Sequence, residues 1–183
     1  MSARPDEPRI APGGRAELGL RTWLLVQVLG RVAGTRPPNL FLTLGRHRRL
    51  FRGWLSFASR LMPFGRLPRR DTELVILRVA HLRGCAYEFE HHVRLGARAG
   101  LRDADVERVK AGPDADGWSP RERLLLRATD ELHATQDLSG ALWTELSREL
   151  DERERIELVM LVGHYEMLAT TIHTLRIQPD EAH

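Results

Sequence analysis

The feature that most constrains the fold of this chain is the segment 68–100, in which two amphipathic helices follow each other with one short break. In its first half, PRRDTELVILRVAHLRG, apolar residues recur at helical spacing. Gly84 suits the left-handed conformation that ends such a helix, and Ala86 to Ala99 form the next helix, up to Gly100. The sequence therefore predicts a tight antiparallel helical hairpin. The residues expected to face the core are Leu74, Ile76, Leu77, Val79 and Ala80.

The remainder of the chain has the same helical character. Further helices are expected over 16–32, from Asn39, over about 50–61, over 103–110, from Ser119 to about 133, from Ser139, and over 153–175. Asn39 is expected to cap the segment that it starts. No stretch alternates apolar and polar residues as a strand would. We therefore predict an all-α, helical-hairpin-based bundle: a single domain over 15–183, preceded by a flexible arm over 1–14 that is rich in Pro, Gly and charge.

The basic residues of the chain are almost all arginine. The formal net charge is only +3, yet the sequence pI is about 9.7, because Lys110 is the only lysine and arginine does not deprotonate. The stretch from Arg46 to Arg70 contains no acidic residue, which is compatible with an anion-binding or nucleic-acid-binding face. No nucleic-acid-binding motif accompanies it, so we expect a solvated surface or a subunit contact and no nucleic-acid partner.

The number of cysteines and the hydropathy of the chain indicate in which cellular compartment the protein is expected. The chain has one cysteine, Cys85, so an internal disulfide is excluded and a secreted, disulfide-stapled fold is not expected. The N-terminal residues lack an apolar signal core. The most hydrophobic early stretch, 18–33, contains Arg21 and Arg31 and is too short to cross a bilayer. We expect a cytoplasmic protein without a membrane partner.

The sequence RGCAYEFEHH at 83–92 holds the candidate chemistry. Gly84 ends one helix, so Cys85 falls at the start of the next, where exposed N–H groups and the helix dipole lower the pKa of a thiol. Cys85, Glu88 and His92 are spaced i, i+3 and i+7 and share one helix face. His92 would then lie close enough to relay a proton, whereas His91 and Glu90 are expected to be exposed.

Glu73 lies in the other arm of the hairpin. Twelve positions before Cys85, it runs opposite the second helix, and its carboxylate can meet either Glu88 or His92. If Glu73 meets Glu88, the repulsion between the two carboxylates would raise the pKa of one of them. A carboxyl group with a raised pKa suits a proton donor or base near neutral pH. On spacing alone, a buried core cysteine beside a surface Glu–His pair is an equally open interpretation.

The spacing of these residues resembles the pattern of the carboxymuconolactone decarboxylase family, which includes alkylhydroperoxidase D. The pattern here is Glu73, then eleven residues, then Cys85-Ala86-Tyr87-Glu88, then three residues, then His92. The resemblance extends over about 39–177, through NLFLTLGRHRRLFRGW, LPRRDTELVILRVA, HHVRLGARAGL and LVGHYEMLAT. It implies an all-α fold and homo-oligomers such as trimers or hexamers. It also implies, for the peroxidase branch, a cysteine pair that a Glu–His proton relay activates.

This chain departs from the redox pattern at one position, because Glu88 stands where the second cysteine of the pair would be. An intramolecular disulfide cannot form, so an oxidised Cys85 would need an external thiol or another subunit to resolve it. The decarboxylase branch does not depend on a cysteine pair, and Glu73, Glu88 and His92 would be its natural acid–base groups.

Three hypotheses about function follow. The first is a peroxiredoxin-like oxidoreductase that reduces hydroperoxides with Cys85, His92 and Glu73 and an external thiol reductant. The second is cofactor-free decarboxylation, lactone cleavage or isomerisation of a carboxylated substrate by Glu88 and His92, with Arg78 or Arg94 holding the carboxylate. The third is a non-enzymatic oligomeric scaffold.

No cofactor and no metal are expected, although Glu73, Glu88, His92 and His164 would suit a first-row metal if they converged. We also expect no nucleotide-dependent chemistry, because phosphate-binding loops and dinucleotide fingerprints are absent from the sequence.

Overall fold

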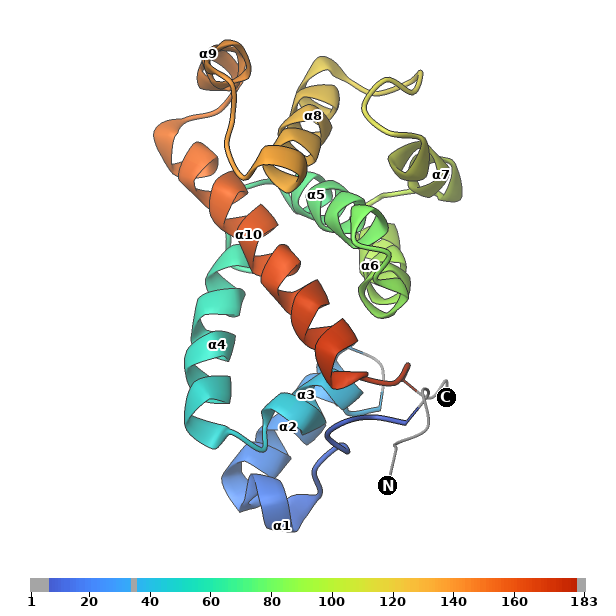
Figure 1. Cartoon of the computed structure of the whole chain (residues 1–183), viewed down its shortest axis with the longest axis vertical. Helices are drawn as coiled ribbons and strands as arrows, with labels where there is room; N and C mark the ends of the chain where they lie inside the picture. The colour runs from blue at the N-terminus through green and yellow to red at the C-terminus, as the bar shows by residue number, and fades with distance from the viewer. Residues whose placement is uncertain (1–6, 34–35, 181–183) are drawn as a thin grey trace. The chain divides into compact units, whose positions relative to one another are not determined.

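The computed structural model describes residues 7–33 and 36–180, and within them every regular element is a helix, as expected (Figure 1). The helices are α1 (Arg15–Leu18), α2 (Leu20–Ala33), α3 (Asn39–Leu44), α4 (Arg48–Leu61), α5 (Arg69–Leu82), α6 (Ala86–Arg98), α7 (Asp103–Ala111), α8 (Pro120–Thr135), α9 (Gly140–Glu149) and α10 (Glu152–Leu175). None of these helices is both long and apolar enough to cross a membrane.

Two helix starts differ from the sequence expectation. The helix expected over 16–32 is divided at Gly19, whose φ of 71° ends α1 before α2 begins. Asn39 is the first residue of α3 and Pro38 takes the cap position, so the expected cap was wrong. The polar groups of Asn39 bind the C-terminal segment instead. Its backbone N–H donates to Asp180 Oδ1 at 2.7 Å, and its side-chain amide donates to the carbonyl of Pro179 at 3.0 Å.

The chain divides into two compact units, one made of 1–58 with 170–183 and the other of 59–169. In the first unit, the described part of the N-terminal arm, residues 7–14, contains no helix but is hydrogen bonded. The N–H of Arg9 donates to the carbonyl of Leu175 at 2.9 Å, and the N–H of Gly13 donates to the carbonyl of Leu42 at 3.1 Å. Residues 1–6 of the predicted arm lie outside the described residues, and the single domain over 15–183 stays a prediction.

The core of the first unit is aromatic. Leu18, Val26 and Phe51 are buried at its centre. The rings of Phe41 and Phe51 lie 5.9 Å apart, and the Trp54 ring lies 5.8 Å from that of Phe51. Aromatic pairs at such separations add to the stabilisation from buried area.

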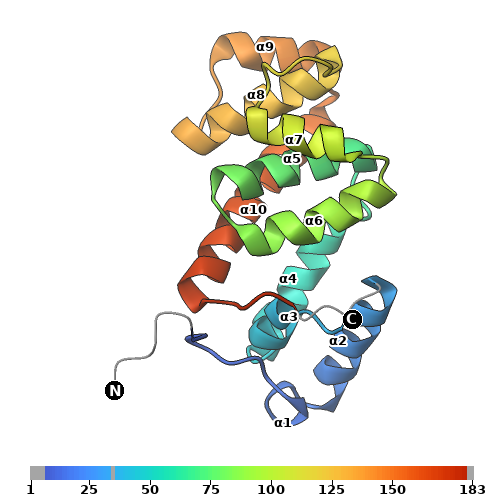
Figure 2. The same ribbon diagram turned by 90° about the vertical axis from the view of Figure 1, so that its right-hand side faces the viewer.

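The second unit is built around α5, which is buried along residues 71–80 because α6, α7 and α8 all pack against it. Figure 2 shows α5 and α6 running antiparallel as the predicted hairpin. An apolar cluster fills the space on one side of α5, and its members are Leu74, Leu77, Leu101, Val109, Trp118 and Leu126. A helix enclosed in this way carries its polar side chains into the interior, where each needs a partner. This burial is what turns Glu73 into a candidate for chemistry.

Candidate active site

The turn between α5 and α6 holds Cys85 in a defined position. Gly84 has φ of 61°, and its N–H donates to the carbonyl of His81 at 3.0 Å. The N–H of Cys85 donates to the carbonyl of Ala80 at 2.8 Å. These two bonds form the Schellman arrangement that closes a helix with glycine in the left-handed conformation. Cys85 then becomes the N-cap residue of α6, so the thiol sits at the helix start that the sequence predicted.

The chemistry of that position differs from expectation. Cys85 is 1 % exposed, and burial, followed by the charge of Glu88, raises the pKa of its thiol to about 12. The backbone N–H of Glu88 acts in the expected direction and lowers the pKa, but this effect is smaller than that of burial. The prediction of a lowered thiol pKa at this helix start was therefore wrong. A low-dielectric interior disfavours the thiolate more than one N–H stabilises it.

Glu88 is the group that faces the thiol. It lies one turn along α6, is 2 % exposed, and neither of its carboxyl oxygens has a hydrogen-bond partner of good geometry among the described residues. Burial raises the pKa of Glu88 to about 8, while weak hydrogen bonding from Cys85 lowers it. The Glu88 carboxyl is therefore mostly protonated at pH 7 and loses its proton near pH 8, so it can donate a proton at neutral pH and accept one above it.

Glu73 meets His92 and not Glu88, which settles between the two contacts that the hairpin allowed. Glu73 Oε2 lies 2.7 Å from His92 Nδ1, and both side chains are buried. The other carboxylate oxygen, Oε1, pairs with Arg69 Nη2 at 2.6 Å. Because the carboxylate accepts a hydrogen bond, Nδ1 of His92 carries the proton and Nε2 is left to accept or transfer another.

Helix α10 contributes residues to the same cluster that the sequence pattern did not identify as part of it. The ring of Tyr165 meets the ring of His92 edge to face at 5.1 Å, and its hydroxyl donates to the sulfur of Met62 at 3.9 Å. Burial, with the charges of Glu73 and Glu88, raises the pKa of Tyr165 well above its usual value. Tyr165 therefore stays uncharged and packs against His92 as a neutral side chain. The only sequence signal was its place in the apolar stretch LVGHYEMLAT.

The other histidines and arginines fall outside the Glu73–His92 and Cys85–Glu88 pairs. His164 is buried, and burial lowers its pKa to about 4, which keeps it neutral at pH 7. His91 is partly buried, and desolvation lowers its pKa to about 3, so the expectation of an exposed His91 was wrong. Among the described residues, no set of three or more His, Cys, Asp or Glu side chains is arranged to hold a metal ion.

Arg78, which the second hypothesis offered as a carboxylate anchor, is already engaged. Its Nε donates to Asp130 Oδ1 at 2.6 Å, its Nη2 donates to Oδ2 at 2.8 Å, and its Nη1 donates to the carbonyl of Val109 at 2.7 Å. This bidentate, partly buried ion pair joins α5 to α8 and leaves the Arg78 guanidinium engaged, so it is not available to a substrate. Arg94 is exposed and contacts His91.

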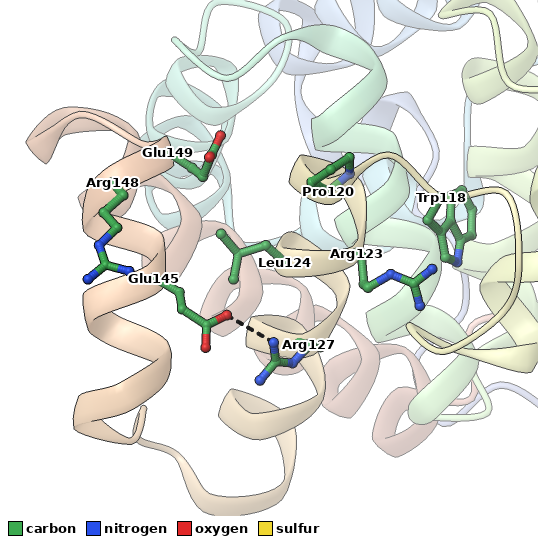
Figure 3. A pocket seen from close by; sticks show the side chains of 8 residues that line it. All are labelled: Trp118, Pro120, Arg123, Leu124, Arg127, Glu145, Arg148 and Glu149. Atoms are coloured by element: carbon green, nitrogen blue, oxygen red, sulfur yellow. Dashed lines mark hydrogen bonds and ion pairs between the residues drawn. The ribbon is translucent and has the colours of Figure 1, made fainter.

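A separate cavity of about 530 Å³ lies between α8 and α9 in the second unit (Figure 3). One ion pair crosses it, from Arg127 Nη1 to Glu145 Oε2 at 3.0 Å, which Figure 3 draws as a dashed line. Its lining contains none of the residues around Cys85. The lining residues are Trp118, Pro120, Arg123, Leu124, Arg127, Glu145, Arg148 and Glu149.

Comparison with known proteins agrees with these features. Residues 48–131 match the Carboxymuconolactone decarboxylase family. The uncharacterized protein YdfG of Bacillus subtilis (strain 168) is 23 % identical over 97 residues, which are 52 % of this chain and 66 % of YdfG, just under two thirds of its length.

Two solved structures illustrate the fold. One is an uncharacterized peroxidase-related protein from Ralstonia eutropha JMP134, described as an alkylhydroperoxidase AhpD core. It matches with a TM-score of 0.83 and 19 % identity, over 98 % of this chain and 95 % of that one. The other is a cysteine-to-alanine variant of the debrominase Bmp8 in complex with 2,3,4-tribromopyrrole. It matches with a TM-score of 0.78 and 18 % identity, over 94 % and 91 % of the two chains.

The resemblance noted in the sequence is therefore confirmed: residues 48–131 match the carboxymuconolactone decarboxylase family, and the described helices have the AhpD-like fold.

Proposed function

We propose that this protein is a thiol-dependent oxidoreductase that reduces hydroperoxides, with Cys85 as the attacking sulfur and Glu88 as the group that takes its proton. The observation that carries the proposal is the buried Cys85–Glu88 pair at the start of α6, beside the Glu73–His92 pair. A thiol needs a base to ionise in such surroundings, and Glu88 stands where the redox pattern of the family would have a second cysteine.

The raised pKa of Cys85 is compatible with this role because one of its causes, the negative charge of Glu88, disappears during the proton transfer. The negative charge of Glu88 helps to raise the pKa of the Cys85 thiol. When Glu88 accepts the thiol proton, its charge disappears and the thiolate no longer faces an anion. The two groups thus titrate as a coupled pair that shares one proton above about pH 8, and the reactive form is the thiolate beside the neutral carboxyl.

The reaction balances with the groups present and one external reductant. The thiolate attacks the terminal oxygen of the hydroperoxide, the O–O bond breaks, and the leaving alkoxide takes the proton from Glu88. Sulfur is oxidised by two electrons to the sulfenic acid, and the peroxide is reduced to an alcohol. An external thiol then forms a mixed disulfide with Cys85 and releases water, and a second thiol restores Cys85. His92, oriented by Glu73, is the second proton carrier.

Hydroperoxide consumption in the presence of dithiothreitol tests this proposal. Cys85→Ser should abolish consumption, and Glu88→Gln should reduce it by about tenfold or more, because a positioned base contributes at least that much. Arg127→Gln serves as the control, since it removes a half-exposed ion pair between α8 and α9. Equal rates in the wild type and Cys85→Ser would sink the proposal.

A second candidate is cofactor-free acid–base catalysis on a small carboxylated substrate. The observation that favours it is the pKa of about 8 at Glu88 next to a thiol that stays protonated. The debrominase Bmp8 has a similar fold, so proteins of this fold are not restricted to the reduction of hydroperoxides. Carbon dioxide release or ring opening of a carboxylated enol lactone should survive Cys85→Ser and be lost in Glu88→Gln and His92→Ala. Loss in Cys85→Ser alone would exclude this candidate.

We also propose that the chain self-associates. One face of α10 in the second unit leaves Ile156, Met160 and Met167 between 46 % and 58 % exposed, and these residues follow one another at helical spacing. Apolar stripes of this kind mark interaction surfaces, and AhpD-like neighbours support an oligomer. Sedimentation of the wild type should give a mass above 20.9 kDa, and Met160→Glu should reduce it. A monomeric wild type would contradict self-association.

A further inference from the structure

Three polar side chains, from α10, from α8 and from the C-cap of α5, meet next to the turn that holds Cys85. Glu166 on α10 accepts a hydrogen bond from His133 Nδ1 on α8 at 2.6 Å through Oε1. Its other oxygen, Oε2, pairs with Nε of Arg83, the C-cap residue of α5, at 3.3 Å. The three side chains are between 25 % and 34 % exposed, so the cluster is partly open to solvent.

Both charged members of the cluster are tied by the backbone to the site. Arg83 precedes Gly84 and Cys85 in the turn that positions the thiol. Glu166 follows Tyr165, whose ring packs against His92. Because Glu166 pairs with Arg83 at 3.3 Å and Arg83 lies two residues before Cys85, one positive and one negative side chain lie next to the turn that starts α6.

The groups that surround Glu88 can be named element by element. Cys85 is the N-cap residue of the helix that carries Glu88, Arg83 comes from the end of α5, and Tyr165 and Glu166 come from α10. The charges of Glu73 and Arg69 of α5 act on Tyr165. The charge of Glu166 raises the pKa of Glu88, and the charge of Arg83 lowers it. The charge of Arg83 also lowers the pKa of Cys85.

We propose that Arg83 and Glu166, with His133 holding Glu166, are positioning residues of the site whose opposed charges shift, in opposite directions, the proton balance that burial gives the Cys85–Glu88 pair. This inference rests on the proposed function only for its use in catalysis. The electrostatic relationship itself belongs to the folded protein and can be measured without any substrate.

Opposed charges give the proposal a signature that a structural role lacks. Glu166→Gln removes a negative charge, so the pair should lose its proton at lower pH. Arg83→Gln removes a positive charge, so the same step should move to higher pH. Simple loosening of the site would let water in and move both variants the same way, toward the ordinary value of a carboxyl group. Opposite shifts therefore separate electrostatics from packing.

The experiment follows two readouts from pH 5 to 10: the rate of Cys85 alkylation by iodoacetamide, and the carbon-13 chemical shift of the Glu88 carboxyl, assigned by its loss in Glu88→Gln. We expect the midpoint to fall by about half a pH unit in Glu166→Gln and to rise by about the same in Arg83→Gln. Arg83→Lys keeps the charge and should stay near the wild type. His133→Gln should move the midpoint in the direction of Glu166→Gln, because Glu166 loses its anchor.

Arg127→Gln is the matched control, because Arg127 shares α8 with His133 and forms an ion pair of similar geometry with Glu145. Unmoved midpoints, or shifts of the same sign in Arg83→Gln and Glu166→Gln, would overturn the inference. The carbon-13 readout decides if iodoacetamide does not reach the thiol. Opposite shifts in a protein without peroxidase activity would leave the inference standing and remove the proposed function. Peroxidase activity together with unmoved midpoints would leave the proposed function standing and remove the inference.

Discussion

The thiol of Cys85 and the carboxyl of Glu88 form a buried pair one helical turn apart, and each shifts the titration of the other. Glu88 raises the pKa of Cys85, which reaches about 12, and Cys85 hydrogen bonding acts against the burial that raises the pKa of Glu88 to about 8. In a two-cysteine member of the family the second position would carry another thiol. Here Glu88 stands at that position and Cys85 is the one cysteine of the sequence, so no disulfide can form within the chain, and the pH dependence of the pair is its most informative property.

The first prediction concerns the reactivity of Cys85 with pH. In the wild type, the alkylation rate should rise up to about pH 8, level off, and rise again toward pH 12, because the pair loses one proton in each step. Glu88→Gln should remove the level stretch and leave one continuous rise. The rates are measured with iodoacetamide and mass spectrometry, and a level stretch that persists in Glu88→Gln would contradict the coupling.

The second prediction is a stability change with pH. The folded-state pKa of Glu88, about 8, lies above the usual value of 4.5, so the folded protein holds the proton more tightly than the unfolded chain does. Stability from this group is complete below pH 4.5 and is lost as pH rises toward 8. Between pH 6.5 and 8 the wild type should lose about 2 kcal/mol relative to Glu88→Gln.

Urea denaturation at several pH values measures this difference. The imidazole of His164 is present in both proteins, so its contribution cancels. Parallel stability curves for the wild type and Glu88→Gln over this interval would show that Glu88 does not hold its proton in the folded state.

The third prediction concerns the buried carboxylate of Glu73. Glu73→Ala leaves His92 and Arg69 without their partner, and breaking a buried pair from one side costs about 3 kcal/mol or more. Glu145→Ala breaks a half-exposed ion pair with Arg127 and should cost less than about 1 kcal/mol. Urea titrations give the free energy of unfolding of each variant. Similar losses in Glu73→Ala and Glu145→Ala would mean that the buried Glu73 pairs do not stabilise the fold more than an exposed ion pair does.

The fourth prediction tests the turn that positions Cys85. A Cβ at Gly84 would meet no atom within 4 Å, so the only obstacle to alanine is the positive φ of 61°. Gly84→Ala should therefore destabilise the protein by about 1 to 2 kcal/mol. Gly53 also has open space around its Cβ but lies inside α4, so Gly53→Ala should stabilise by about 0.5 to 1 kcal/mol. Changes of the same sign would argue against the assigned turn.

The amino-acid sequence by itself determined the helices of the second unit and the position of Cys85 between two of them. Apolar spacing and the glycine after α5 are local signals, and the Schellman bonds at Gly84 and Cys85 depend only on residues 80–85. The pairing of Glu73 with His92 was one of two contacts that the predicted hairpin allowed. These features were predictable because each involves neighbours along one helix or across one turn.

Tertiary structure decided the rest. The pKa of Cys85 rises where its place at a helix start predicts a fall, because desolvation depends on everything packed around the thiol and not on its helix. Tyr165 and Glu166 reach the site from α10, more than seventy residues away in sequence, and no local pattern indicates which face of that helix meets α6. Helical spacing specifies which residues share a face, whereas the burial of that face, and hence its acid–base chemistry, follows from packing between distant segments.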